Sequence, residues 1–225
     1  MRLLASTAIV FAVCAATRAQ ESNLARVISA DAPGAAVVWL PDGISSGMFA
    51  WRIAACAGVP MIFEALLFDY RDPAIVGERV DLAGLTVREA LDVLVAHDPR
   101  YAWEERSGTI IIRPSSLAAS ADDMLNRRVA AVKDSRVDLN DILATVTGAG
   151  SRRSGSVRPA MDSKVFAIDA PGGTILDVLV SAAQAHGGVM WTMPDGVQGQ
   201  ERGALSLGYR TFAHEPVGTC TSGGR

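Results

Sequence analysis

Apolar residues gather into short runs and helical stripes, and the first of these lie between residues 36 and 64. The runs 36–40 and 61–64 are bounded by Pro and Gly residues, so they predict strands. Between them, the apolar stretch 48–57 predicts a helix that Ser45 or Ser46 caps. The pattern of this region is therefore strand, helix, strand.

Residues 80–113 carry the clearest pattern. Thr86 and Glu89 have the spacing of a capping box, in which each side chain satisfies a backbone amide at the start of a helix. Apolar residues then recur at helical spacing along one face and predict a helix over 87–97. The predicted strands around it are 80–82, 101–105 and 109–113, the last two joined by Ser107-Gly108 as a tight hairpin. Strand 109–113 is also a candidate exposed edge for pairing with another chain.

The second half of the chain repeats this order. Its predicted elements are a helix at 138–147, a flexible loop at 148–158, a strand at 165–169, a helix from Thr174 to Ala185 and a hairpin of 189–193 with 204–209. The string Leu-Asp-Val-Leu-Val occurs at 91–95 and again at 176–180. Together with the shared element order, this string predicts an internal repeat.

The first residues have the layout of a secretory signal. Arg2 precedes an apolar core at 9–13, and small residues follow at Thr17 and Ala19. An uncleaved anchor or a buried first helix is the alternative interpretation. The predicted organisation is a signal peptide at 1–19, a first module with an N-terminal extension at 20–115, a connector at 116–137, a second module at 138–212 and a flexible tail at 213–225.

Composition and charge narrow the function classes. Hydrophobic residues make up 49% of the 225 positions, which excludes a disordered chain. The 21 basic residues are outnumbered by 24 acidic ones, so nonspecific nucleic-acid binding is not expected. No apolar run after residue 19 is long enough to predict a transmembrane helix.

Residues 49–113 resemble the STN domain, the short N-terminal module that secretins share with TonB-dependent receptors. The resemblance rests on the segments 57–63, 80–82, 85–94 and 109–112, and residues 138–209 resemble the same module more loosely. It implies an α+β fold of two small βαββ-type modules, with helices packed on short mixed sheets. It also implies docking to envelope proteins in the periplasm, and it offers no catalytic residue. The chain ends after the second repeat, so we expect no membrane barrel and transfer no channel or receptor function.

The predicted function is therefore that of an exported, non-enzymatic interaction or scaffold module of the bacterial cell envelope. Its expected partners are of the secretion or TonB type, and its expected location is the periplasm, with association to the outer membrane as a further option. The alternative is a serine hydrolase that uses the Gly43-Ile44-Ser45-Ser46-Gly47 turn, because G-x-S-x-G between a strand and a helix exposes a nucleophile in such enzymes. A carrier of a small apolar ligand between the repeats is a third hypothesis.

Few residues in the sequence are candidates for a binding, redox or metal-ligating role. After signal removal Cys56 and Cys220 remain, and they either pair in an oxidising compartment or stay as two thiols. Arg152, Arg153 and Arg158 form a local basic cluster, which is either a solvated loop or a partner-binding arm. The three histidines lack ligand spacing, so no metal site and no cofactor are expected.

Overall fold

The computed structural model describes residues 22–29, 36–38, 46–65, 79–148, 164–194 and 208–211. The elements of the first half are η1 (Asn23–Ala25), β1 (Ala36–Val38), α1 (Ser46–Ala57), β2 (Met61–Ala65), β3 (Arg79–Asp81), α2 (Val87–His97), β4 (Tyr101–Arg106) and β5 (Thr109–Pro114). Those that follow are α3 (Ser115–Ala118), η4 (Met124–Asn126), β6 (Arg128–Val129), β7 (Val132–Val137), α4 (Leu139–Thr147), β8 (Phe166–Ala170), β9 (Gly173–Thr174), α5 (Ile175–His186), β10 (Val189–Pro194) and β11 (Gly208–Thr211).

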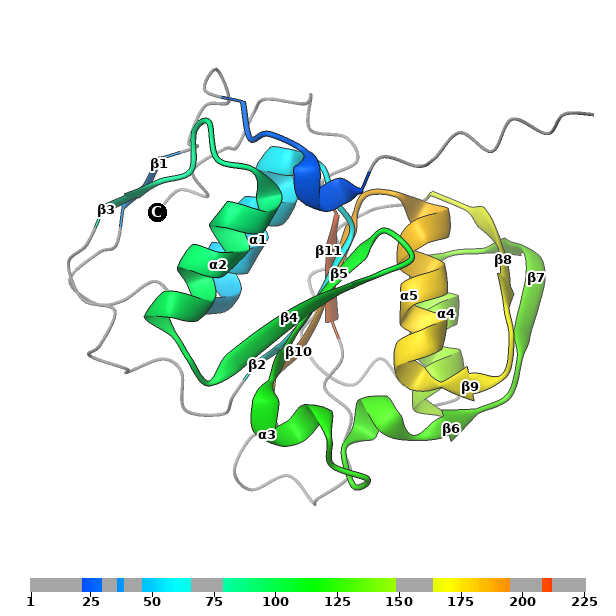
Figure 1. Ribbon diagram of the computed structural model, residues 1–225. Helices are drawn as coiled ribbons and strands as arrows, with labels where there is room; N and C mark the ends of the chain where they lie inside the picture. The colour runs from blue at the N-terminus through cyan, green and yellow to red at the C-terminus, as the bar shows by residue number, and fades with distance from the viewer. Residues whose placement is uncertain are drawn as a thin grey trace, which may run out of the picture.

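A five-stranded sheet in the order β11-β10-β2-β5-β4 lies at the centre of the molecule (Figure 1). Its inner strands β10, β2 and β5 are parallel, with Trp191 beside Ile62 and Ile62 beside Ile111. The outer strands β11 and β4 run antiparallel to their neighbours. The predicted α+β class is confirmed, and strands from both halves of the chain share this one sheet.

Helices cover the sheet on both faces. Figure 1 shows α1 and α2 on one side and α4 and α5 on the other. Because side chains alternate along a strand, Met61 and Phe63 join the core with α1 and α2, whereas Ile62 joins the core with α4 and α5. The run Ile110-Ile111-Ile112 divides in the same way, and all three side chains are buried. An unbroken apolar run is typical of a strand covered on both faces.

The local predictions around helices α2 and α5 are confirmed. α2 spans 87–97, and Thr86 and Glu89 form the capping box. Ser107 and Gly108 both have positive φ, at 52° and 79°, as the tight turn between β4 and β5 requires. α5 begins after Thr174, whose hydroxyl accepts from the Asp177 amide in a second capping box.

Two features differ from the sequence-based expectation. Strand 109–113 is not an edge, because β5 lies between β2 and β4, and the two edge strands of this sheet are β4 and β11. The other difference is β7, which falls inside the predicted connector and pairs antiparallel with β8. Its four middle side chains are exposed, so it lacks the apolar alternation by which a strand is recognised.

Two capped helices, each followed by a strand, occur at a constant spacing along the chain. Eighty-eight residues separate Thr86 from Thr174, and the same interval separates Trp103 from Trp191. Both threonines cap a helix, and both tryptophans are the third residue of the strand that follows it. The Leu-Asp-Val-Leu-Val strings are 85 residues apart, so they are one helical turn out of this register.

Several predictions fall outside the described residues. They are the signal peptide 1–19, Ser45, the basic cluster Arg152, Arg153 and Arg158, Cys220 and the tail 213–225. Within the described ranges, no helix combines the length and the apolar character needed to cross a bilayer.

Candidate functional site

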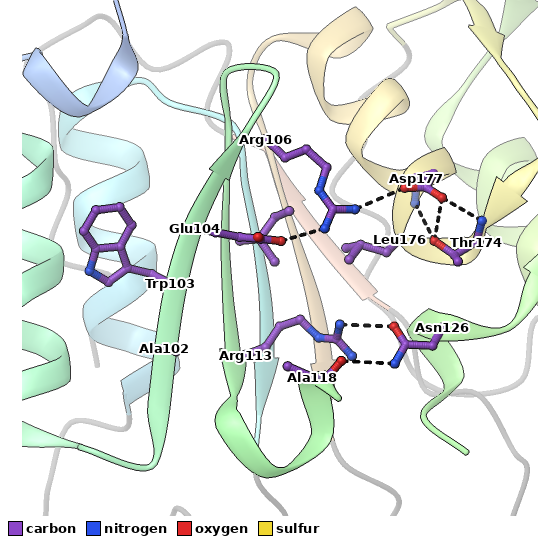
Figure 2. A pocket seen from close by; sticks show the side chains of 11 residues that line it. Ala102, Trp103, Glu104, Arg106, Arg113, Ala118, Asn126, Thr174, Leu176 and Asp177 are labelled. Carbon is purple, nitrogen blue, oxygen red and sulfur yellow. Dashed lines mark hydrogen bonds and ion pairs between the residues drawn. The ribbon is translucent and has the colours of Figure 1, made fainter. Parts of the chain in front are cut away.

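A groove of about 490 Å³ runs along β4 on the side of the sheet that carries α5. Its floor is formed by β4 and β5, and its wall by the start of α5 together with α3 and η4 (Figure 2). The lining residues are Ala102, Trp103, Glu104, Arg106, Ile111, Arg113, Ala118, Asn126, Thr174, Leu176 and Asp177. The groove therefore lies beside the edge strand β4 and combines apolar side chains with charged ones.

Strand β4 presents backbone groups away from β5. The amide of Ser115 donates to the Arg100 carbonyl, and the two-residue turn closes on the pair Arg106 and Thr109. Hydrogen-bonded pairs alternate along an antiparallel ladder, so the backbone groups of Trp103 and Glu105 point outward. Among the described residues, no strand pairs with this outer side of β4.

The Trp103 side chain supports β4 from the α2 side, opposite the groove (Figure 2). Its indole nitrogen donates to Asp92 Oδ1 at 3.1 Å. The Arg88 guanidinium lies 5.3 Å from the ring centroid, which is a cation–π distance. Asp92 and Arg88 both belong to α2. The edge strand β4 is therefore held to this helix at Trp103, one of the residues whose backbone groups point outward.

Arg106 links the edge strand to α5 across the groove. It donates to Glu104 Oε1 at 2.7 Å and to Asp177 Oδ1 at 3.1 Å (Figure 2). Burial raises the pKa of Asp177, but hydrogen bonds from Thr174 and the charge of Arg106 outweigh it, so the net pKa is lowered. The two carboxylates outnumber the one arginine, which leaves this end of the groove with a net negative charge.

A buried charge cluster closes the other end of the groove. Arg113 Nε donates to Glu64 Oε2 at 2.8 Å, and Arg113 Nη2 lies 3.0 Å from Asp123 Oδ1. Arg113 Nη1 also donates to the Asn126 side-chain oxygen at 3.3 Å (Figure 2). The exposed fractions are only 5% for Glu64, 7% for Arg113 and 7% for Asp123. One buried cation therefore faces two buried carboxylates.

This arrangement disfavours full ionisation of the cluster. Desolvation raises the pKa of Glu64 to about 7. Arg113 lowers this pKa, but the nearby Asp123 carboxylate opposes that effect. Glu64 ends the apolar run of β2, and Arg113 ends that of β5. Sequence reasoning missed this pair, although a charge of opposite sign at the end of each of two buried strands is a signal that could have found it.

Ser46, which follows the proposed hydrolase nucleophile Ser45, is held in a structural contact. Ser46 is 2% exposed and donates to Asp98 Oδ2 at 2.8 Å. Asp98 in turn binds the Arg100 guanidinium at 2.7 Å. Gly47 packs against the sheet, since a Cβ at this position would lie 2.9 Å from Phe63 Cε1. Close packing of α1 on β2 thus accounts for the glycine of the motif, and Ser45 lies outside the described residues.

The other candidate residues are not brought together at the groove. Cys56 is buried on α1 and is disulfide-bonded, and its partner lies beyond the described residues. His97 and His186 lie in the last turns of α2 and α5. In the described part of the chain, no three His, Cys, Asp or Glu side chains are grouped as a metal site would require. Comparison with known proteins adds no relative, because no protein-family model, curated protein or solved structure matches the chain.

Proposed function

We propose that this chain is an exported, non-enzymatic interaction module of the bacterial cell envelope that docks partner proteins at the edge of its sheet. The observation that carries the proposal is the outer side of β4, where Trp103 and Glu105 direct backbone groups away from the sheet beside a groove. An unpaired edge next to side-chain pockets is what strand-addition binding uses. Hydrogen bonds to the backbone give affinity, and the groove gives specificity.

Two further observations support the cellular address and the module type. The disulfide at Cys56 is typical of an oxidising compartment such as the periplasm, in keeping with the predicted export signal at 1–19. The repeat of helix cap, helix and strand at 88-residue spacing supports two modules of the STN type. In each half a two-stranded antiparallel pair, β1 with β3 and β7 with β8, precedes the capped helix.

The proposal is tested by photocrosslinking in the native host. The full-length chain carries a photoreactive residue at Ala102, which is exposed on β4, or at Lys133 on β7 as a distant exposed control. We expect specific protein adducts from position 102 and only background adducts from position 133. Equal adduct patterns from the two positions would refute docking at β4.

A matched pair of variants checks that the backbone groups at the edge of β4 are responsible for partner binding. E105P removes an outward amide without touching a ladder hydrogen bond, whereas E105A removes only the carboxylate that accepts from Ser22 and Asn23. We expect the position-102 adducts to disappear with E105P and to persist with E105A. Adducts that persist in a folded E105P chain would show that the edge is not the binding element.

A further inference from the structure

The 88-residue spacing identifies a strand in the second half of the chain whose edge is equivalent to the outer edge of β4 and is already paired. β4 and β10 are counterparts, because each follows a capped helix and carries the tryptophan of the 88-residue interval. Each also pairs antiparallel with the next strand of its own half, β5 or β11. The remaining side of β10 is occupied by β2, which runs parallel to it with Ile62 beside Trp191.

We infer that the outer edge of β4 takes an extended segment of a partner protein in parallel orientation, with a basic side chain directed at Glu104. This inference rests on the proposed docking function and adds the direction and chemistry of the partner. The direction follows from β10, whose equivalent edge accepts a parallel strand. The residue beside Trp103 occupies the place that Ile62 occupies beside Trp191.

The side-chain requirement follows from which groups face the groove. Neighbouring residues in paired strands point to the same side of the sheet, so partner residues beside Ala102 and Glu104 face the groove. Glu104 and Asp177 share the single guanidinium of Arg106, and their side chains are 55% and 39% exposed. The unbalanced carboxylate of this trio attracts a lysine or arginine from the partner strand.

In a second copy of the folded chain, β2 cannot fill this edge. Both sides of β2 are already paired, with β10 and with β5. An extended partner segment with a lysine or arginine opposite Glu104 meets the charge requirement of the groove, where two carboxylates share Arg106. We therefore assign the edge to a partner rather than to self-association.

The order of crosslinks along the partner tests the direction. Photoreactive residues are placed separately at Ala102 and Arg106 of the full-length chain in its native host, about 13 Å apart along the strand. Adducts are digested, and the crosslinked partner residues are identified by mass spectrometry. We expect the residue captured from position 106 to lie C-terminal, in the partner, to the residue captured from position 102.

The charge requirement is tested with E104Q, using E89Q at the start of α2, which does not line the groove, as the matched control. We expect E104Q to lower the adduct yield from position 102 by about two- to fivefold, the effect of losing one partly exposed ion pair. The captured partner segment should contain a lysine or arginine within two residues of the crosslink. An unchanged yield with E104Q, or a captured segment without a basic residue, would overturn the charge assignment.

The remaining outcomes separate the inference from the function on which it rests. A reversed order of crosslinks would overturn the parallel orientation and leave docking at β4 intact. Adducts formed only with another copy of this chain would overturn the partner assignment. Absence of any specific adduct at either position would refute the proposed function itself.

Discussion

Replacing Glu64 with glutamine tests the energetics of the buried charge cluster. In the folded chain the carboxyl group lies between Arg113 Nε and the Asp123 carboxylate and is 5% exposed. E64Q keeps an oxygen that accepts from Arg113 and supplies an amide that donates toward Asp123. The substitution therefore imitates the protonated carboxyl group and removes its ability to ionise.

The size of the effect follows from the raised pKa. The folded chain binds the Glu64 proton with a pKa of about 7, against 4.5 in the unfolded chain. Because the folded state holds this proton more tightly, Glu64 stabilises the fold fully below pH 4.5 and loses that contribution as the pH rises through 7. Between pH 5 and pH 8 the loss amounts to about 2 to 3 kcal/mol of unfolding free energy.

Urea unfolding of the wild type and E64Q at pH 5 and at pH 8 measures this difference. We expect E64Q to be the more stable protein at pH 8 by about 2 to 3 kcal/mol and to match the wild type closely at pH 5. The control is E104Q, which removes a largely exposed carboxylate outside the buried cluster. The reasoning fails if the stability difference between E64Q and the wild type is the same at both pH values.

Four further substitutions test the packing, a helix cap and the covalent link. Thr109 is fully buried, and its hydroxyl makes no hydrogen bond to the described residues. T109V should therefore raise the unfolding free energy by about 1 kcal/mol in a urea titration. T86V deletes a helix cap and should lower the unfolding free energy by a similar amount. G47A forces a Cβ to within 2.9 Å of the Phe63 ring and should cost about 1 to 3 kcal/mol in the same titration, and an unchanged midpoint would refute the close packing of α1 on β2. C56S should lower stability by about 2 to 4 kcal/mol and make the melting temperature insensitive to reductant, whereas a reductant-sensitive C56S chain would contradict the disulfide at this residue.

The sequence predicts local structure well where one residue type determines a local hydrogen bond. The capping boxes at Thr86 and Thr174 and the Ser107-Gly108 turn are of this kind, because each depends on residues at most three positions apart. The three consecutive isoleucines at 110–112 also contain the information that β5 is covered on both faces.

The arrangement of the strands is less accessible to sequence reasoning. The pairing of β10 with β2 joins residues more than 120 positions apart, and no local pattern specifies which edge a strand meets. The candidate site depends on this pairing, since it leaves β4 as the outer strand. The repeated Leu-Asp-Val-Leu-Val string predicted a repeat, but it lies about one helical turn out of the spacing of the capping threonines, because an apolar helix can reproduce such a string one turn away. The true register is marked by the capping threonines and the tryptophans Trp103 and Trp191.

The shared sheet makes the two halves of the chain interdependent. Ile62 and Ile111 belong to the first half, yet the helices that keep them from water belong to the second. Residues 20–115 expressed alone would expose this apolar face together with the bare edge of β2, a combination that leads to aggregation. The protein should therefore unfold in a single transition. Neither half can be exchanged for a relative or evolve independently unless the contact between the two halves is repacked.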